Sequence, residues 1–384
     1  MTQNINVGIV GFGWMGQVHA RAMTRVRQHY RDLGATPRLV AVADPADDGR
    51  VDFARDVFGI GWTGSDWQEL VVRDDVDLVC VAGPNFTHRD VAVTAAGAGK
   101  HIWIEKPAGR NLTETQQIAD AISAAGVASA VGFNYRNAPA VELARDLVAA
   151  GRIGDVRHVR IQLLGDYSAH PEGALTWRFV RDLAGSGVVG DLASHGLDLA
   201  QYVVGPIGAL LAETSTFIAE RPAAVGASSH FARGGDGPLL RVENEDHVLT
   251  LLRFSGGARG VLEASRASVG EQNSYAFEIH GSTGALAWDF RRMGELRECL
   301  DQDYQGASWT VHRVGPGDGE AAAFQPDTAI PLSFDDLKVI EAKRLLTSIV
   351  TGKPEGATIT DMVTAARLVD ATLRSAAEKR WVTL

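Results

Sequence analysis

The fold of this chain is decided by residues 7–23, VGIVGFGWMGQVHARAM. An apolar run over residues 7–10 stops at a G-x-G-x-x-G turn, and a helix-forming segment follows at once. Gly11 permits a sharp turn off a strand, Gly13 lets backbone amides approach a pyrophosphate, and Gly16 lets helix and strand pack closely. The helix then directs its N-terminal amides at the phosphates. The sequence predicts a dinucleotide-binding turn, and the alternative is an ordinary glycine-rich turn.

A carboxylate after the second apolar run indicates which dinucleotide is bound. Residues 39–43 end at Asp44, whose carboxylate can accept hydrogen bonds from the diol of the adenosine ribose. Asp44 comes later than the usual spacing of about 20 residues, and a lengthened helix and loop over 25–36 explains the delay. A carboxylate here repels a 2′-phosphate, and Pro45 follows where an NADP enzyme can place an arginine, so NAD is favoured. The alternative is that Asp44 ends the strand and begins a turn with Pro45.

Length and composition set the class of protein. The 384 residues exceed the usual size of one hydrophobic core, so two domains are expected. The formal net charge is −10 and no block of lysine or arginine occurs, which gives no support to binding of nucleic acid or anionic membranes. No run reaches transmembrane length and no basic-then-apolar leader is seen, so we expect a cytoplasmic protein.

Cysteine, histidine and carboxylate residues give no sign of a metal site. Cys80 and Cys299 lie far apart in the sequence, and Cys80 falls in an apolar run, so we expect a buried reduced thiol. No cluster of metal-binding residue types has ligand spacing, and no metal is predicted.

The first part of the chain predicts an α/β fold with a Rossmann-type, doubly wound parallel sheet over residues 1–135. Apolar runs of strand length, 76–82, 101–105 and 128–133, alternate there with helical stretches. Ligands gather beyond the carboxyl ends of the strands in such sheets. The residues expected at that edge are the glycine turn, Asp44, and the segments 84–88, 105–107 and 134–136.

The pattern changes after residue 138 and predicts an α+β second domain over residues 136–384. Strand-like segments follow one another without helices between them, which is typical of a large, mostly antiparallel open sheet. They are 156–164, 211–217, 247–254, 260–264, 275–280 and 285–288. Two glycine-rich polar stretches, 220–237 and 301–327, are expected to be loops. Two amphipathic helices close the chain, and their packing back on the first domain is left open.

Three stretches carry residues suited to chemistry. Lys106, at a strand end, can hold a reacting hydroxyl oxygen with its ammonium, or it can be a solvated surface lysine. A helix beginning near Asp191 places Asp191, His195 and Asp198 on one face, which suits a general base with an orienting carboxylate. A helix cap, a satisfied interior histidine and a solvated aspartate are the alternatives. Trp177-Arg178 can place a ring and a cation near the cofactor, or simply pack on the surface.

Together these motifs resemble the Gfo/Idh/MocA oxidoreductase family. The likeness runs nearly end to end and includes Gly352-Lys353-Pro354 between the closing helices. Glu-Lys-Pro combined with Asp-x-x-x-His at this separation is a specific signal, although each part alone is not. The motifs that carry it are Gly-Phe-Gly-Trp-Met-Gly, Asp44, Pro84-Asn85-x-x-His88, Glu105-Lys106-Pro107, 132–136 and Asp191-x-x-x-His195.

The resemblance implies a role for each matching position. Lys106, Asp191 and His195 are catalytic, with His195 as the proton acceptor, and the Lys106–Pro107 peptide is often cis in similar enzymes. Substrate contacts fall to Lys106, Asn134, Arg136, Asp191 and His195. The cofactor-binding residues are Gly11, Phe12, Gly13, Trp14, Met15, Gly16, Asp44, Asn85, His88, Glu105, Lys106, Trp177 and Arg178.

We therefore expect an NAD-dependent dehydrogenase that oxidises a secondary hydroxyl of a sugar, anhydrosugar or cyclitol such as inositol. The resemblance also implies a homodimer or homotetramer formed through the open sheet. One alternative is a glycosidase that acts through transient oxidation by tightly held NAD. Another is a non-catalytic regulator that senses sugar and keeps the cofactor.

Overall fold

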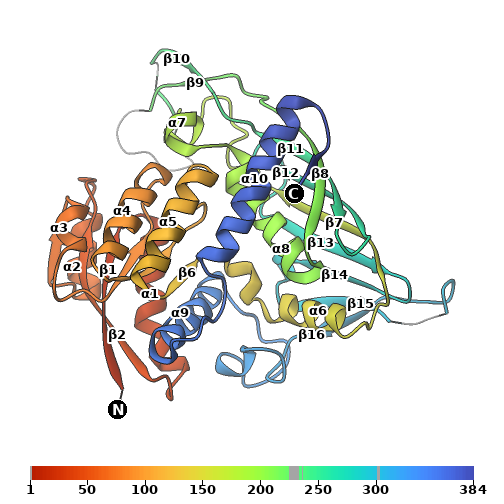
Figure 1. The fold of residues 1–384 in the computed structure, drawn as a ribbon, viewed down its shortest axis with the longest axis horizontal. Coiled ribbons are helices and arrows are strands. Elements are labelled where there is room, and N and C mark those ends of the chain that lie inside the picture. The colour runs from red at the N-terminus through yellow and green to blue at the C-terminus, as the bar shows by residue number, and fades with distance from the viewer. Residues whose placement is uncertain (1, 225–232, 236, 301–302) are drawn as a thin grey trace. The chain divides into compact units, whose positions relative to one another are not determined.

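The structure, a computed structural model, describes residues 2–224, 233–235, 237–300 and 303–384 (Figure 1). The chain forms two compact units: unit 1 is Met1–Asn137 with Ser333–Thr364, and unit 2 is Ala138–Leu332 with Ala365–Leu384. The chain thus passes from unit 1 to unit 2 close to the expected boundary at residue 135. The chain then returns to unit 1 at Ser333, and a single domain boundary at residue 135 does not describe this return.

Unit 1 is built on a six-stranded sheet in which every pair of neighbours is parallel. This confirms the predicted Rossmann-type sheet. Strand β4 is buried along its whole length, as expected for a strand covered on both faces, and Cys80 within it is a buried free thiol. In spatial order the strands are β3 (Trp62–Gly64), β2 (Ala35–Ala43), β1 (Gln3–Val10), β4 (Leu78–Val81), β5 (His101–Ile104) and β6 (Ser129–Val131).

Helices cover the strands of this sheet. Helix α1 packs against α9, which arrives from the later part of the chain, while α4 packs between α3 and α5. The helices of unit 1 are α1 (Trp14–His29), α2 (Arg50–Phe58), α3 (Trp67–Val71), α4 (Asn85–Gly97), α5 (Leu112–Ala125), the short η1 (Asn134–Asn137) and α9 (Phe334–Thr351).

Unit 2 contains a nine-stranded sheet in which β7 and β12 are parallel and all other neighbours are antiparallel. This confirms the predicted large, mostly antiparallel sheet. In spatial order its strands are β16 (Thr310–Arg313), β15 (Glu295–Cys299), β14 (Ala285–Asp289), β13 (Ser274–Gly281), β7 (Val156–Leu164), β12 (Arg259–Ser265), β11 (His247–Phe254), β8 (Ile207–Ser215) and β17 (Val382–Thr383).

The two stretches predicted as loops contain strands, so that prediction is wrong in part. Strand β9 (Glu220–Pro222) pairs with β10 (Leu239–Arg241), and β16 pairs with β15. These strands are only three to five residues long, and β10 and β16 are largely exposed, so an alternation of apolar and polar residues did not reveal them. Residues 225–232, 236 and 301–302 of the same stretches lie outside the described residues.

Two helices, α6 and α8, lie side by side against one face of the nine-stranded sheet. Strand β11 shows how the two faces differ. Its residues Val248, Thr250 and Leu252 are buried, whereas Leu249 and Leu251, on the opposite face, are 43% and 45% exposed. This sheet therefore has one covered face and one open face that carries apolar side chains.

The helical segments of unit 2 are α6 (Pro139–Ala149), η2 (Trp177–Phe179), α7 (Arg181–Ala184), η3 (Val189–Ala193), α8 (Ser194–Val204), η4 (Phe290–Arg292), η5 (Ala321–Ala323) and α10 (Ile359–Glu378), which runs from unit 1 into unit 2.

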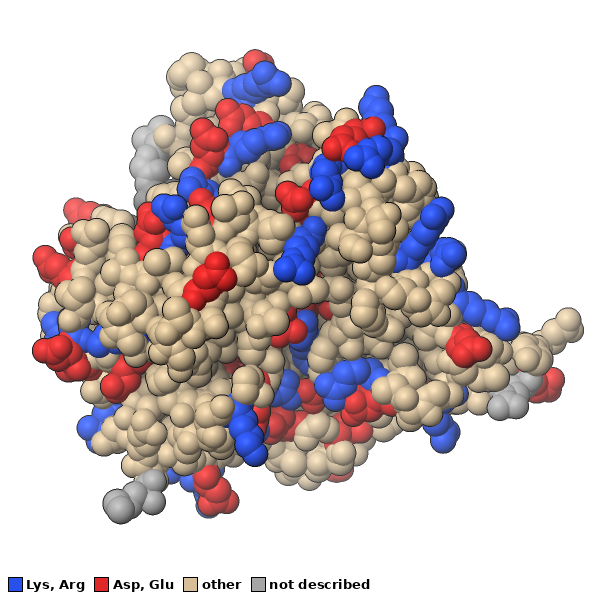
Figure 2. Space-filling model, in the orientation of Figure 1, with Lys and Arg blue, Asp and Glu red and all other residues tan. Residues whose placement is uncertain are grey.

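Acidic and basic side chains are interspersed on the face of the molecule shown in Figure 2. Across the described residues, no helix has both the length and the apolar character needed to span a membrane.

Candidate active site

The glycine turn between β1 and α1 has the geometry of a phosphate cradle. Gly11 has a φ of +86°, and a Cβ there would lie 2.5 Å from the backbone nitrogen of Gly83. A Cβ on Gly16 would lie 2.0 Å from the carbonyl oxygen of Gly11. Gly13 differs, because the nearest atom to its Cβ position is Arg50 Nη1 at 3.7 Å. Two glycines therefore serve close packing, and the third leaves open space in front of the helix N-terminus, where a pyrophosphate fits.

The other residues of the turn differ in exposure. Phe12 is fully buried and meets Phe58 edge-on at 5.8 Å between ring centroids. Trp14 is 64% exposed and lies over Phe334. Met15 is half-buried. The predicted cofactor contacts of these three side chains remain predictions.

Asp44 lies directly beside the turn. Its Oδ2 accepts a hydrogen bond from the backbone N–H of Phe12 at 2.6 Å, and its Oδ1 accepts one from Ala46 at 2.9 Å. The guanidinium of Arg50 donates to Oδ2 at 3.1 Å. The carboxylate is thus fixed at the carboxyl ends of β1 and β2, where the ribose of a dinucleotide is expected.

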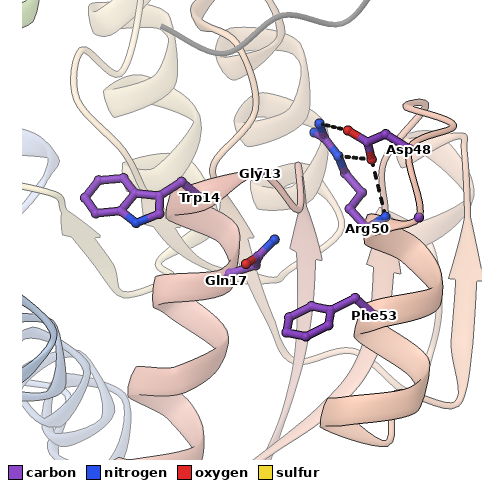
Figure 3. A pocket seen from close by; sticks show the side chains of 7 residues that line it. Gly13, Trp14, Gln17, Asp48, Arg50 and Phe53 are labelled. Atoms are coloured by element: carbon purple, nitrogen blue, oxygen red, sulfur yellow. Dashed lines mark hydrogen bonds and ion pairs between the residues drawn. The ribbon is translucent and has the colours of Figure 1, made fainter. Parts of the chain in front are cut away.

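A hollow of about 330 Å³ opens between the glycine turn and the start of α2 (Figure 3). It is lined by Gly13, Trp14, Gln17, Asp48, Gly49, Arg50 and Phe53. Arg50 and Asp48 were not among the predicted site residues. The available signal was an arginine six positions after a strand-ending aspartate, at the start of a helix.

His88 connects the segments that follow β4 and β5. Its Nδ1 lies 2.9 Å from the carbonyl oxygen of Pro107, and its Nε2 lies 2.8 Å from that of Gly83. Burial lowers the pKa of this imidazole, so the neutral ring donates to one of the two carbonyls. Asn85 begins α4 three residues earlier. Both residues stand at the predicted edge, and their cofactor contacts remain predictions.

Glu105 is held by a buried charge cluster. Its Oε1 accepts hydrogen bonds from Lys338 Nζ at 2.6 Å and from His19 Nε2 at 2.8 Å. Lys338 also donates to Glu341 Oε1 at 2.9 Å, and Trp103 Nε1 donates to the same oxygen at 2.6 Å. We call these five residues the Lys338 cluster. Lys338 was not predicted, because it lies in α9, far from Glu105 along the chain.

The electrostatics of the Lys338 cluster favour an ionised Glu105. Burial opposes ionisation, but the charge of Lys338 and the hydrogen bond from His19 outweigh it and lower the pKa of Glu105. The pKa of His19 is lowered by its own burial, and its ring stacks on Trp103 at 3.8 Å between centroids. Glu105 is therefore a charged anchor beneath Lys106, which is half-exposed and joined to Pro107 by a cis peptide bond, as the resemblance implied.

Asn134 and Arg136 follow β6 in the η1 turn. Asn134 is 3% exposed, and its Nδ2 has no hydrogen-bond partner among the residues that the structure describes. Arg136 pairs with Asp361 at 3.0 Å. Because β2, β1, β4, β5 and β6 are neighbours, the structure brings all the predicted residues of unit 1 to one edge of its sheet. Substrate contacts of Asn134 and Arg136 remain predictions.

In unit 2 the Asp191 motif lies where a wide π-helical turn meets a regular helix. Asp191 falls in η3 and His195 in the first turn of α8, where it is 6% exposed. Tyr167 donates from its hydroxyl to Asp191 Oδ2 at 2.6 Å. Tyr167 was not foreseen, because it sits in an irregular segment after β7. Burial and the charge of Asp191 raise the pKa of Tyr167, which keeps it a proton donor to that carboxylate.

A second carboxylate anchors the start of this helical segment. Glu245 Oε1 accepts hydrogen bonds from the backbone N–H groups of Gly187 at 2.7 Å and Val189 at 3.0 Å. Gly187 is required there, because a Cβ would lie 2.1 Å from the carbonyl oxygen of Glu245. The hydrogen bonds from Gly187 and Val189 to Glu245 therefore hold in place the backbone that immediately precedes Asp191.

Trp177 and Arg178 occupy the short η2 helix. The guanidinium of Arg178 lies over the Trp177 ring, 4.3 Å from the centroid, and its backbone oxygen accepts a hydrogen bond from Asn244. Burial lowers the pKa of Arg178. Their predicted contacts to nicotinamide remain predictions. Among the described residues, no group of three or more His, Cys, Asp or Glu side chains is arranged to hold a metal ion.

Comparison with known families decides the class of protein. Residues 5–133 match the oxidoreductase family with an NAD-binding Rossmann fold, and residues 141–287 match the GFO/IDH/MocA C-terminal domain. The chain belongs to the Gfo/Idh/MocA family. The resemblance, the Rossmann fold and NAD as cofactor are thereby confirmed.

Several members of the Gfo/Idh/MocA family match this chain over nearly its whole length. A levoglucosan dehydrogenase of Pseudarthrobacter phenanthrenivorans is 36% identical over 384 residues, covering 99% of this chain and 98% of that protein. A solved levoglucosan dehydrogenase in complex with NADH and levoglucosan is 34% identical, with a TM-score of 0.92 and 99% of each chain covered. An inositol 2-dehydrogenase of Rhizobium meliloti is 26% identical, with 99% of each chain covered.

Proposed function

We propose that the protein oxidises one secondary hydroxyl of an anhydrosugar, sugar or cyclitol to a ketone, with NAD as hydride acceptor. The observation that carries the proposal is the full-length similarity to a levoglucosan dehydrogenase in a chain that retains Lys106, Asp191 and His195. The phosphate cradle and Asp44 support the cofactor part, and the Tyr167–Asp191 hydrogen bond supports an oriented carboxylate next to the base.

The proposed chemistry divides among three side chains. His195 accepts the proton of the substrate hydroxyl, because an imidazole titrates near neutral pH. The ammonium of Lys106 stabilises the developing alkoxide, and Asp191 orients the substrate and the imidazole. Bound NAD supplies the hydride acceptor, to which the carbon that carried the hydroxyl gives its hydrogen with the electron pair.

The remaining proposed contacts follow the family motif residue by residue. In this proposal the cofactor is contacted by the glycine turn, Asp44, Asn85, His88, Trp177 and Arg178, and the substrate by Asn134 and Arg136. For Glu105 the structure supports an indirect contribution, since its carboxylate is engaged with Lys338 and His19.

The test is a screen of the purified protein with NAD against levoglucosan, aldoses and inositols. NADH absorbance at 340 nm is followed while products are analysed. We expect NADH to accumulate in step with a ketone product from at least one anhydrosugar or polyol. Cleavage of a glycoside without net NADH would instead establish the glycosidase alternative, and no cofactor reduction on any compound would contradict the proposal.

We further propose a cytoplasmic homodimer or homotetramer that associates through the open face of the nine-stranded sheet. A monomer rarely exposes a contiguous apolar surface, and Leu249 and Leu251 stand on that face. Replacing both by lysine is expected to reduce the mass in solution to that of a monomer, measured by light scattering. A matched pair at exposed Val57 and Val72 in unit 1 should leave the mass unchanged. An unchanged mass in the Leu249/Leu251 variant would place the interface elsewhere.

A further inference from the structure

The hollow beside the glycine turn is lined by a cation, Arg50, that the sequence motifs do not assign to the cofactor. Arg50 Nε donates to Asp48 Oδ1 at 2.7 Å, and Nη2 donates to Asp48 Oδ2 at 2.5 Å (Figure 3). Its third nitrogen, Nη1, donates to Asp44 Oδ2 at 3.1 Å. Arg50 therefore bridges the carboxylate expected at the ribose and a second carboxylate beside it.

The pair between Arg50 and Asp48 is accessible to a competing anion. The side chain of Arg50 is 25% exposed, and that of Asp48 is 43% exposed. The planar guanidinium fork that receives a carboxylate in two parallel hydrogen bonds also fits a phosphate. A phosphate on the ribose 2′-oxygen would lie next to Asp44, within the surroundings of Arg50 Nη1.

We propose that Arg50 is a latent binding residue for the 2′-phosphate of NADP, and that Asp48 maintains the preference for NAD by occupying its fork. With Asp48 in place, one guanidinium is matched by two carboxylates, so the local charge repels a phosphate. Without Asp48, Nε and Nη2 of Arg50 become available to a phosphate, and the guanidinium keeps one neighbouring carboxylate, that of Asp44. The inference rests on dinucleotide binding at this turn and not on which hydroxyl compound is oxidised.

The test compares ligands that differ only at the ribose 2′-position. Calorimetric titration gives the dissociation constants of 2′,5′-ADP and 5′-AMP for the wild-type protein and for Asp48→Ala. We expect Asp48→Ala to improve the binding of 2′,5′-ADP relative to 5′-AMP by about tenfold, the usual value of one charge-assisted hydrogen bond. The ratio of kcat/KM for NADP over NAD should rise in the same direction. Because the titration needs no substrate, its result does not depend on the proposed oxidation.

Two further variants separate release of the fork from a general loss of negative charge. Asp52 lies in the helix that Arg50 begins, pairs with Arg55 and has a side chain that is 69% exposed. Asp52→Ala should therefore leave the ratio of the 2′,5′-ADP and 5′-AMP dissociation constants within about twofold of the wild-type value. Adding Arg50→Met to Asp48→Ala should abolish the gain. The proposal is overturned if Asp48→Ala leaves the ratio unchanged, if Asp52→Ala gives the same gain, or if the gain survives without Arg50.

Discussion

Replacing His195 by alanine is expected to lower turnover by about 10²–10⁴-fold, the usual contribution of a general base. The imidazole lies at the start of α8, four residues after Asp191, whose carboxylate is held by the Tyr167 hydroxyl. Without the imidazole the substrate hydroxyl loses its proposed proton acceptor. The measurement is kcat from NADH absorbance, alongside the dissociation constant of NAD from calorimetry.

The affinity for NAD should stay nearly constant in His195→Ala, because the glycine turn and Asp44 are unchanged. His280→Ala, at a histidine on the same unit whose side chain is 40% exposed, should keep turnover within about twofold. Wild-type turnover in His195→Ala would show that another group accepts the proton. An equal loss of NAD binding would show that His195 acts in cofactor binding instead.

Replacing Lys338 by methionine is expected to destabilise the protein by about 3–5 kcal/mol, because it leaves buried carboxylates without their cation. Lys338 is 1% exposed and donates to both Glu105 and Glu341. The free energy of unfolding is obtained from a urea titration followed by circular dichroism.

Lys343→Met is the matched control on the same helix. Its partially exposed ammonium lies 3.4 Å from Glu355, and loss of such a pair costs about 0–1 kcal/mol. The double variant Lys338→Met with Glu105→Gln should recover part of the lost stability, because it removes one uncompensated charge. Equal stabilities for Lys338→Met and Lys343→Met would contradict an electrostatic role for the Lys338 cluster.

Strands with one covered face were readily predicted from the sequence. Strands β7 and β11 have the predicted bounds, 156–164 and 247–254, because their side chains alternate between core and open face. Strands β9 and β16 were missed, since three or four residues are too few to show such a pattern and β16 is largely exposed.

The same reasoning explains which site residues were found. The glycine turn, Asp44 and Lys106 follow strands of a parallel sheet, so their common edge follows from chain order. Lys338, Arg50 and Tyr167 depend on contacts between distant segments or on irregular backbone. Neither the periodicity of apolar residues nor the spacing of motifs in the sequence indicates such contacts.

The dependence of unit 1 on α9 has a consequence for how the protein is made. Glu105 and Lys338 are 233 residues apart in sequence, and the whole of the middle segment is synthesised between them. While the nascent chain leaves the ribosome, Glu105 therefore lacks its counter-charge until residue 338 has been synthesised. Unit 1 thus cannot complete its buried charge cluster until the segment Ser333–Thr364 has followed unit 2 residues 138–332 out of the ribosome.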